Sequence, residues 1–214
     1  MNPIQVQIIR RPNNPFFKAC VDSLQHEPID LVVSDYGSHL DTRLKFIEGA
    51  TAPYIFLMDD DDEVVPGIFA KLLTALESSP DAIGAYSHEV FIDETGNVTN
   101  AKPHFSRKFD PKYAASTYHF PRAWIIRTDA AQAAASFIRT NAVSQYIYPE
   151  ATIAVLAGLC GEWVEMDEVG YRYRQHAGGL SASMPHQWYR VATTNLIAGA
   201  RDLIAATAAD TGYI

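Results

Sequence analysis

The sequence predicts an α/β fold, with a mostly parallel sheet flanked by helices in a single domain. Two observations support this prediction. Short apolar runs rich in β-branched residues alternate with stretches whose apolar residues recur at helical spacing, through roughly the first eighty residues. Such alternation is typical of parallel strands joined by right-handed crossover helices. A chain of 214 residues is also long enough to bury one sizeable core.

The first half of the chain contains three predicted strand–helix pairs. They cover residues 4–9 and 15–26, residues 29–34 and 39–48, and residues 54–58 and 66–78. Gly49 ends the second helix. Pro66 suits the first turn of the third helix, where a missing N–H is not needed.

The second half is predicted to be less regular. We expect a strand at residues 83–92, helices at 128–140 and 150–159, a strand pair at 163–166 and 169–174, and a last helix after Pro185. Residues 94–97 are typical of a turn. The irregular, aromatic stretch at residues 103–121 indicates a surface lid.

Composition and charge narrow the class of protein. The formal net charge is −8, which argues against a surface that coats DNA. No stretch approaches the ~18 apolar residues of a membrane span, and the first residues lack the pattern of a signal peptide. Cys20 and Cys160 form no metal-type pair and are typical of free thiols in a reducing cytosol. We therefore expect a cytoplasmic protein without a membrane span.

Four consecutive aspartates, residues 59–62, follow the buried-strand pattern of residues 54–58. Ligands of open α/β sheets bind outside the carboxyl ends of the strands. Like charges ~4 Å apart near a protein surface repel by about 4 kcal/mol, so these acids favour a cation. Oxygen ligands suit Mg²⁺, Mn²⁺ or Ca²⁺. The alternative is a solvated acidic turn that caps the next helix.

Residues 101–127 form a basic and aromatic segment in this acidic chain. Its charged residues are Lys102, Arg107, Lys108, Lys112, Arg122 and Arg127, against one acid, Asp110. One interpretation is a solvated face over an aromatic core. The other is a platform for an anionic or planar acceptor, which Lys108, Lys112 and Arg122 would contact.

Three segments together resemble family 2 glycosyltransferases of the GT-A fold. Residues 31–38 (LVVSDYGS) are similar to the VVVDDGS signature of that family, and residues 55–62 with Pro66 are similar to its FLDxDD…P segment. Residues 171–176 (YRYRQH), followed by Leu180 and Ser181, resemble its late YxYRxH…S segment. Order and approximate spacing agree over roughly residues 4–181.

Two departures mark this chain as a short version of the family. The Pro-Thr-Tyr-Asn that follows the first strand in the family is here Arg10-Arg11-Pro12-Asn13. The usual extra helix and strand before the third strand are missing, which leaves residues 38–52 in that interval.

The resemblance implies a metal-dependent, hexosyltransferase-like enzyme that moves a sugar from a nucleoside-diphosphate sugar to an acceptor hydroxyl with inversion. Residues 1–182 would form the GT-A domain, with a nucleotide-sugar half (1–100) and an acceptor half (101–182). Residues 183–214 would add a C-terminal helix packed on it. The donor of first choice is a UDP-sugar, and the cofactor is Mn²⁺ or Mg²⁺. The acceptor would be a glycan, a small molecule or a modified nucleic-acid base.

The resemblance also assigns the acids of the DxD motif. Asp59 would face the ribose or the metal, and Asp61 would be the direct metal ligand, with Asp60 assisting at the donor. His176 would complete the metal site. Asp62 is expected to cap the following helix.

The remaining site residues are implied in the same way. Asp35 would hydrogen-bond the nucleotide base, Arg43 would lie near the diphosphate, and Arg10 with Arg11 would contact the nucleotide or a phosphate. Glu150 stands at the start of a late helix, where the family carries its catalytic acid, and would be the general base. A glutamate at a helix start also favours the helix dipole without any catalysis.

Two other classes of function remain open from the sequence. Residues 60–64 (DDDEV) match the DxDxV pattern of haloacid-dehalogenase-like phosphatases, in which Asp60 would be the nucleophile and Asp62 its partner. The motif follows the third strand here rather than the first. The third reading is a non-catalytic module that binds a sugar nucleotide or a nucleic acid.

Overall fold

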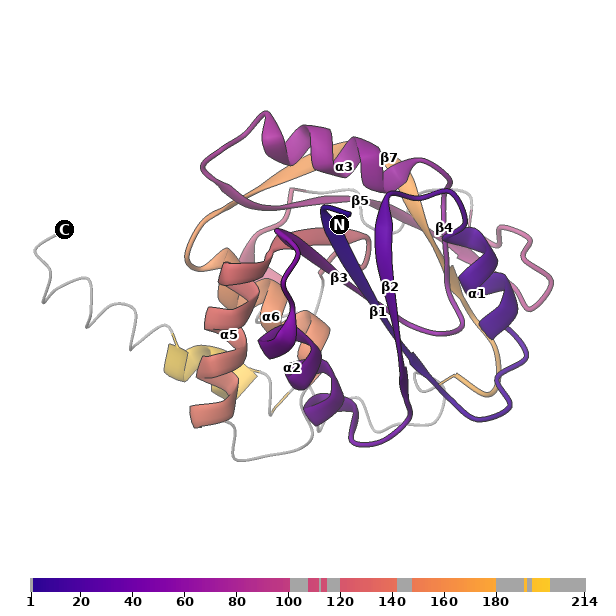
Figure 1. The fold of residues 1–214 in the computed structure, drawn as a ribbon, viewed down its shortest axis with the longest axis horizontal. Coiled ribbons are helices and arrows are strands. Elements are labelled where there is room, and N and C mark those ends of the chain that lie inside the picture. Colours follow the sequence, from indigo (N-terminus) through magenta and orange to yellow (C-terminus); the bar gives the residue numbers. More distant parts are fainter. Residues whose placement is uncertain are drawn as a thin grey trace, which may run out of the picture.

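The computed structural model describes residues 2–100, 108–111, 113–114, 120–141, 148–179, 191 and 194–200. These residues form a seven-stranded mixed sheet with strand order β2-β1-β3-β6-β5-β7-β4, flanked by helices (Figure 1). The predicted fold class is confirmed.

The bounds of the elements agree broadly with the prediction. The strands are β1 (Ile4–Arg10), β2 (Ile29–Asp35), β3 (Tyr54–Met58), β4 (Glu63–Val64), β5 (Ala82–Ile92), β6 (Trp124–Arg127) and β7 (Glu162–Arg174). The helices are α1 (Phe17–Ser23), α2 (His39–Gly49), α3 (Ile68–Glu77), α5 (Thr128–Asn141) and α6 (Pro149–Gly158).

Strands β1, β2 and β3 form the parallel part of the sheet. Strand β1 lies between the other two, with Arg10 opposite Asp35 and Ile8 opposite Met58. Their carboxyl ends therefore meet at one edge. The residues that follow β1 and β3 are brought together there, although ~50 positions separate them in the sequence.

The rest of the sheet is more mixed than the sequence predicts. Strand β6 runs antiparallel to both β3 and β5, and β4 runs antiparallel to β7, whereas β7 is parallel to β5. The predicted pair at residues 163–166 and 169–174 is wrong, because β7 is one long strand. Its register shifts by a bulge opposite His88, and the bulge accommodates the residues that suggested a turn.

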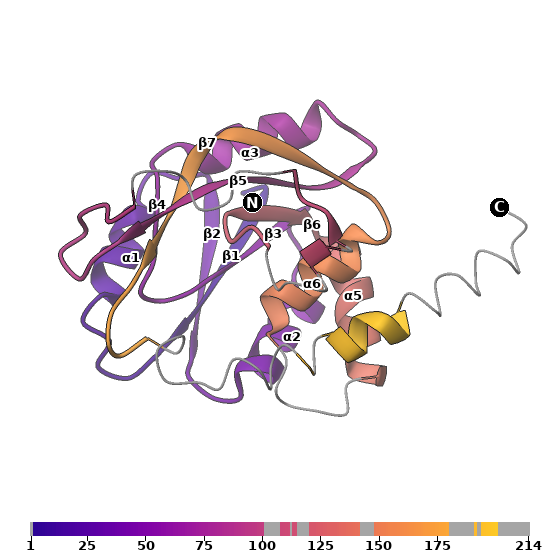
Figure 2. The same ribbon diagram turned by 180° about the vertical axis from the view of Figure 1, so that it is seen from behind.

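Two helical layers cover the sheet. Helices α2, α5 and α6 share one apolar core, whereas α1 and α3 share another on the opposite face (Figures 1 and 2). Strand β3 is buried throughout: Ile55 and Leu57 belong to the first core, and Phe56 and Met58 belong to the second. The period of two along the strand thus fills both layers, which explains its continuous apolar sequence.

Helix α3 begins later than predicted. Pro66 and Gly67 instead form a turn closed by a hydrogen bond from the Ile68 N–H to the Val65 carbonyl, 3.2 Å long. Gly67 has φ of 82° and ψ of 2°, the values of the third residue of a type II turn, which glycine adopts without strain. The Pro-Gly pair decides the local structure here.

The C-terminal part is described only in fragments. The helical residues 194–200 bury Ile197 and Ala200 in the core of α5 and α6. The predicted boundary at residue 182, Lys112 and most of the predicted lid lie outside the described residues. Each helix in the described ranges falls short of what a bilayer crossing needs in length and apolar character. Cys20 and Cys160 are both free thiols.

Gly170 is required where β7 packs against α3 and pairs with β5. A Cβ at this position would overlap the Ser87 hydroxyl and the Ile68 side chain, whereas a Cβ on Gly49 would meet nothing within 4 Å. We expect Gly170→Ala to lower the free energy of unfolding by about 1–3 kcal/mol, and Gly49→Ala to change it by less than about 1 kcal/mol. Urea unfolding of both variants checks this, and equal effects would contradict the role of Gly170.

Candidate active site

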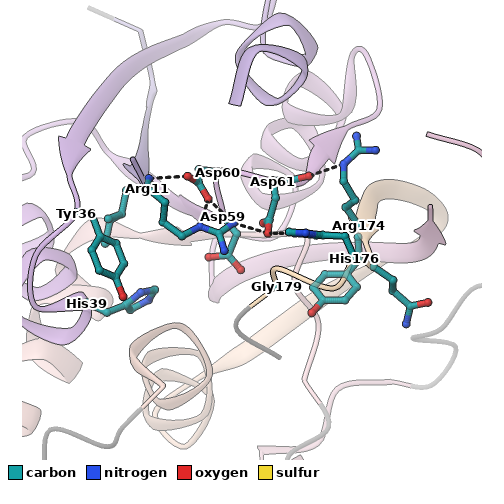
Figure 3. A pocket seen from close by; sticks show the side chains of 12 residues that line it. Arg11, Tyr36, His39, Asp59, Asp60, Asp61, Arg174, His176 and Gly179 are labelled. Carbon is teal, nitrogen blue, oxygen red and sulfur yellow. Dashed lines mark hydrogen bonds and ion pairs between the residues drawn. The ribbon is translucent and has the colours of Figure 1, made fainter. Parts of the chain in front are cut away.

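A pocket opens at the carboxyl edge of β1 and β3. Its cavity volume is about 270 Å³, and its walls come from the ends of β1, β3 and β7 and from the start of α2. Figure 3 shows the side chains of Arg11, Asp60, Asp61 and His176 converging on it. The buried strand β3 ends at this edge, so its following acids enter the pocket, as a site at the mouth of an α/β sheet requires.

Asp60 is held entirely by the segment after β1. The Arg11 backbone N–H donates to Oδ2 at 2.6 Å, and Arg11 Nε donates to Oδ1 at 2.7 Å. Asn14 donates to the Asp60 carbonyl at 2.9 Å. Burial lowers the pKa of Arg11, but its hydrogen bonds and charge interactions with Asp60 and Asp61 raise that pKa above its ordinary value. Asp60 is therefore a buried partner of Arg11.

Asp61 and His176 lie together, although 115 positions separate them. His176 Nε2 is 2.9 Å from Asp61 Oδ2, and the same carboxylate oxygen accepts a hydrogen bond from Arg11 Nη2. The His176 ring packs edge-on against Phe16, with centroids 4.7 Å apart. Phe16 thus helps to orient the imidazole. The structure brings the two predicted metal ligands together, and their role as ligands stays a prediction.

Arg43 is fully buried and joins four parts of the fold. Its guanidinium donates to the carbonyls of Gln7 (3.1 Å) and Met58 (2.8 Å), and to the carboxylates of Asp59 (3.3 Å) and Glu150 (2.6 Å). Arg43 is predicted to lie near a diphosphate, but its side chain is fully buried and so cannot contact a ligand directly. Any effect of Arg43 on a donor would pass through Asp59.

Glu150 lies at the N-terminus of α6 and also contacts His39, at 2.8 Å from His39 Nε2 to Glu150 Oε1. Burial raises the pKa of Glu150, but His39 and Arg43 outweigh it and hold that pKa well below its usual range. Burial lowers the pKa of His39, yet the Glu150 carboxylate raises it above the ordinary value. Glu150 is therefore ionised at neutral pH.

His39, Asp59 and Glu150 each offer one donor atom, and these atoms lie within 4.8 Å of one another. This is a second place where a cation could be held. Arg43 already neutralises two of its members. No metal-type spacing predicts this group, because its members come from α2, the end of β3 and the start of α6.

Asp62 has a structural role that differs from the predicted one. It is fully buried and accepts hydrogen bonds from the Tyr171 hydroxyl (2.7 Å) and the Arg174 N–H (2.8 Å). The prediction that it caps the following helix is wrong, because Gly67 occupies the N-cap of α3. With Asp60 and Asp62 both buried and engaged, the phosphatase reading has no exposed nucleophile.

Arg10 and Asp35 form an exposed ion pair of 2.8 Å across the ends of β1 and β2. They line a second hollow, which shares Arg11 and Tyr36 with the main pocket. The predicted base-contacting residue thus lies beside the pocket and not in it. A ligand spanning both hollows would pass over Arg11.

Of the three predicted acceptor residues, Lys108 and Arg122 lie in the described part of the chain. Arg122 donates to the buried Glu89 carboxylate at 2.6 Å, and its guanidinium carbon lies 4.1 Å from the centroid of Tyr173. Tyr173 lines the pocket, so Arg122 supports one wall. Lys108 is exposed, and Lys112 lies outside the described part of the chain.

Comparison with known proteins identifies the fold. The model of glycosyl transferase family 2 matches residues 39–134. The structure of S. aureus TarS 1–349 with UDP-GlcNAc superposes with a TM-score of 0.55 at 13% identity, covering 85% of this chain and 61% of that one. The same fragment with UDP gives 0.55 at 11% identity, with 81% and 61% covered. The predicted resemblance to family 2 GT-A glycosyltransferases is confirmed.

The family 2 match does not reach every predicted site residue. It includes Arg43 and the four aspartates but ends before Glu150 and His176. At these identities the likeness to TarS shows the fold alone, and this chain spans about three fifths of the TarS fragment, 61%. No curated protein matches the chain in sequence.

The sequence reasoning missed two features of the site. The sequence predicts Arg11 as a contact for the donor and does not predict its pairing with Asp60 and Asp61. It predicts His39 only as the start of a helix. The one available signal was its position directly after the YGS turn, at the same sheet edge as the acids.

The His39–Glu150 pair should make stability depend on pH. Because the folded pKa of His39 is raised, its contribution is fully present below the unfolded value of about 6.5 and is lost as pH rises through the folded pKa. His39→Gln should therefore cost more at pH 6 than at pH 9, by roughly 1 kcal/mol. Urea unfolding at both pH values measures it. In a Glu150→Gln background the difference should disappear, and its persistence there would contradict the pairing.

Proposed function

We propose that this protein transfers a sugar from a nucleoside-diphosphate sugar to an acceptor hydroxyl, with the help of a divalent cation and with inversion. The observation that carries the proposal is the pocket at the ends of β1 and β3, where Asp59, Asp60 and Asp61 meet Arg11 and His176 in a GT-A fold. Structures of TarS with the same fold contain UDP-GlcNAc or UDP, which supports a UDP-sugar as donor.

The donor would extend over both hollows. Its base and ribose would lie beside Arg10 and Asp35, which are exposed and line the second hollow. That hollow shares Arg11 and Tyr36 with the main pocket. Its diphosphate would then reach Arg11 and the aspartates. Asp59 suits the ribose or the metal, because nearly half of its side chain, 46%, is exposed. Asp60 would act through Arg11, since it is itself buried.

The cation would be Mn²⁺ or Mg²⁺, held by Asp61 and His176. A carboxylate oxygen and an imidazole nitrogen 2.9 Å apart in the pocket wall are donors that Mn²⁺ accepts well. The residues therefore fit the ion. When bound, it would neutralise the charge that develops on the diphosphate leaving group.

Glu150 would take the proton from the acceptor hydroxyl. It is ionised at neutral pH and lies beside His39 and Asp59, which both line the pocket. Its contacts with Arg43 and His39 lower its pKa and so reduce its strength as a base. A role through the neighbouring His39 is the direct alternative, and substitution of each residue separates the two.

The acceptor would approach from the side of Tyr173 and Arg122, with Lys108 and Lys112 from the basic segment. Arg122 stacks on Tyr173 next to the pocket, which suits an anionic or planar group on a glycan, a small molecule or a modified nucleic-acid base. Binding of nucleotide sugars without any transfer or slow hydrolysis would favour the non-catalytic module instead.

Asp61→Asn should abolish the effect of Mn²⁺ on nucleotide binding, because it removes a ligand charge from the proposed metal site. We expect the wild-type protein to bind UDP more tightly with Mn²⁺ than with EDTA, and the variant to bind equally in both. Isothermal titration calorimetry measures this, with the surface variant Asp22→Asn as control. An Asn variant with undiminished Mn²⁺ dependence would exclude Asp61 as the ligand.

Glu150→Gln should lower kcat by roughly 10²–10⁴, the usual contribution of a general base, and leave UDP affinity within a few-fold. The amide keeps a hydrogen-bond acceptor for Arg43 and removes the basic group. Turnover with an acceptor identified by screening, and calorimetry with UDP, are measured on the same variant. Near-wild-type turnover of Glu150→Gln would leave Glu150 with a helix-capping and packing role. If kcat falls by this factor in His39→Gln and not in Glu150→Gln, the proton transfer belongs to His39.

A further inference from the structure

The Arg11 guanidinium donates a hydrogen bond to Asp61 Oδ2, the oxygen that a metal held by Asp61 and His176 would coordinate. Its backbone N–H and Nε hold Asp60 through both carboxylate oxygens, at 2.6 and 2.7 Å, and its Nη2 reaches across to Asp61 Oδ2. That same oxygen of Asp61 faces His176. A cation held by Asp61 and His176 and the guanidinium therefore compete for one site.

Arg11 and Arg43, which both pair with carboxylates of the aspartate run, differ in their freedom to respond. Arg43 is fully buried, and it donates hydrogen bonds to Gln7 in β1, Met58 in β3, Asp59 directly after β3 and Glu150 in α6. Arg11 lines the cavity, with 19% of its side chain exposed. Its link to Asp61 uses the single terminal nitrogen Nη2, whereas Asp60 is held by the backbone N–H and Nε and also lies 2.7 Å from Nη2. Arg11 can release Asp61 by a small rotation and remain anchored on Asp60.

Arg11 also lies where the proposed donor would pass from one hollow to the other. It is shared by the main pocket and by the hollow beside Arg10 and Asp35. A guanidinium forms paired hydrogen bonds with phosphate oxygens as readily as with a carboxylate. A diphosphate that entered the pocket would thus offer Arg11 a new anionic partner, at the same time as a cation needs Asp61.

We propose that Arg11 is the internal counter-ion of the donor-free pocket: it competes with divalent cations for Asp61 and turns to the diphosphate when a nucleotide binds. This rests on the proposed donor site. Because the two events exchange one partner for another, cation and nucleotide bind cooperatively. By linkage, each raises the affinity of the protein for the other by the same factor.

The proposal makes opposite predictions for the two ligands. In Arg11→Gln, Asp61 loses its competitor, so Mn²⁺ alone should bind about tenfold more tightly. The same variant loses a phosphate contact, so UDP in EDTA should bind about tenfold more weakly; each change is the size of one charged interaction, ~1.4 kcal/mol. Calorimetry with Mn²⁺ alone, and with UDP in EDTA, measures both without any turnover.

Arg10→Gln is the matched control for the Mn²⁺ measurement. It removes the same charge one position earlier, from an exposed pair with Asp35, so Mn²⁺ affinity should change by less than about twofold. Should Arg11→Gln fail to fold, Arg11→Lys carries the test, because lysine keeps the charge and loses the planar fork. It should change both affinities in the same directions, by smaller factors.

The outcomes separate this role from structural support. Weaker binding of both ligands in Arg11→Gln, or unchanged Mn²⁺ affinity, would overturn the proposal, because removal of a competitor for Asp61 must tighten Mn²⁺ binding. Absence of glycosyl transfer by the wild-type protein, with tighter Mn²⁺ binding in Arg11→Gln, would overturn the proposed function and leave the competition at Asp61 intact. Unchanged Mn²⁺ affinity in Arg11→Gln, with glycosyl transfer by the wild-type protein, would overturn the competition at Asp61 and leave the proposed function intact.

Discussion

The buried guanidinium of Arg43 is the interaction on which the site depends. It ties α2 to the backbone of β1 and β3 and to Glu150 at the start of α6. A buried charge is tolerated only when its hydrogen bonds are satisfied, and removing one partner leaves the other uncompensated. Glu150, and through it His39, are therefore fixed in position before any ligand arrives. The low pKa of Glu150 is the direct consequence of this arrangement.

Four identical residues in a row acquire four different roles from their surroundings. The Asp59 side chain is 46% exposed and faces the pocket, Asp60 is 2% exposed and paired with Arg11, and Asp61 is 12% exposed between Arg11 and His176. Asp62 is fully buried against Tyr171. Partners within the protein contact each acid: Arg43 contacts Asp59, Arg11 contacts both Asp60 and Asp61, and the Tyr171 hydroxyl donates to Asp62. Each acid of the run thus has a hydrogen-bond or ion-pair partner within the protein itself.

The sequence predicted the elements well because their signals are local. The apolar run of β3 and the Pro-Gly pair are both recognisable within a few residues. The sequence predicts Pro66 in the helix, however, and the structure has it in the turn. The partners of the acids could not be read, since Arg11 lies about 50 positions from Asp60 and Asp61. Nothing in the local sequence distinguishes Asp61 from Asp62. Only the register of β7 decides which one meets Tyr171 and which one meets His176.

Strand β7 therefore connects folding to function. Its bulge opposite His88 sets the register in which Arg174 donates to Asp62 and His176 reaches Asp61. A slip of one residue moves every side chain of a strand to the opposite face of the sheet. Such a slip in β7 would turn Tyr171 away from Asp62 and His176 away from the pocket. Gly170 permits the close approach to Ser87 and Ile68 that holds this register. The second half of the candidate metal site is thus built by the pairing of β5 with β7, a contact between parts of the chain ~80 residues apart, and it forms together with the core.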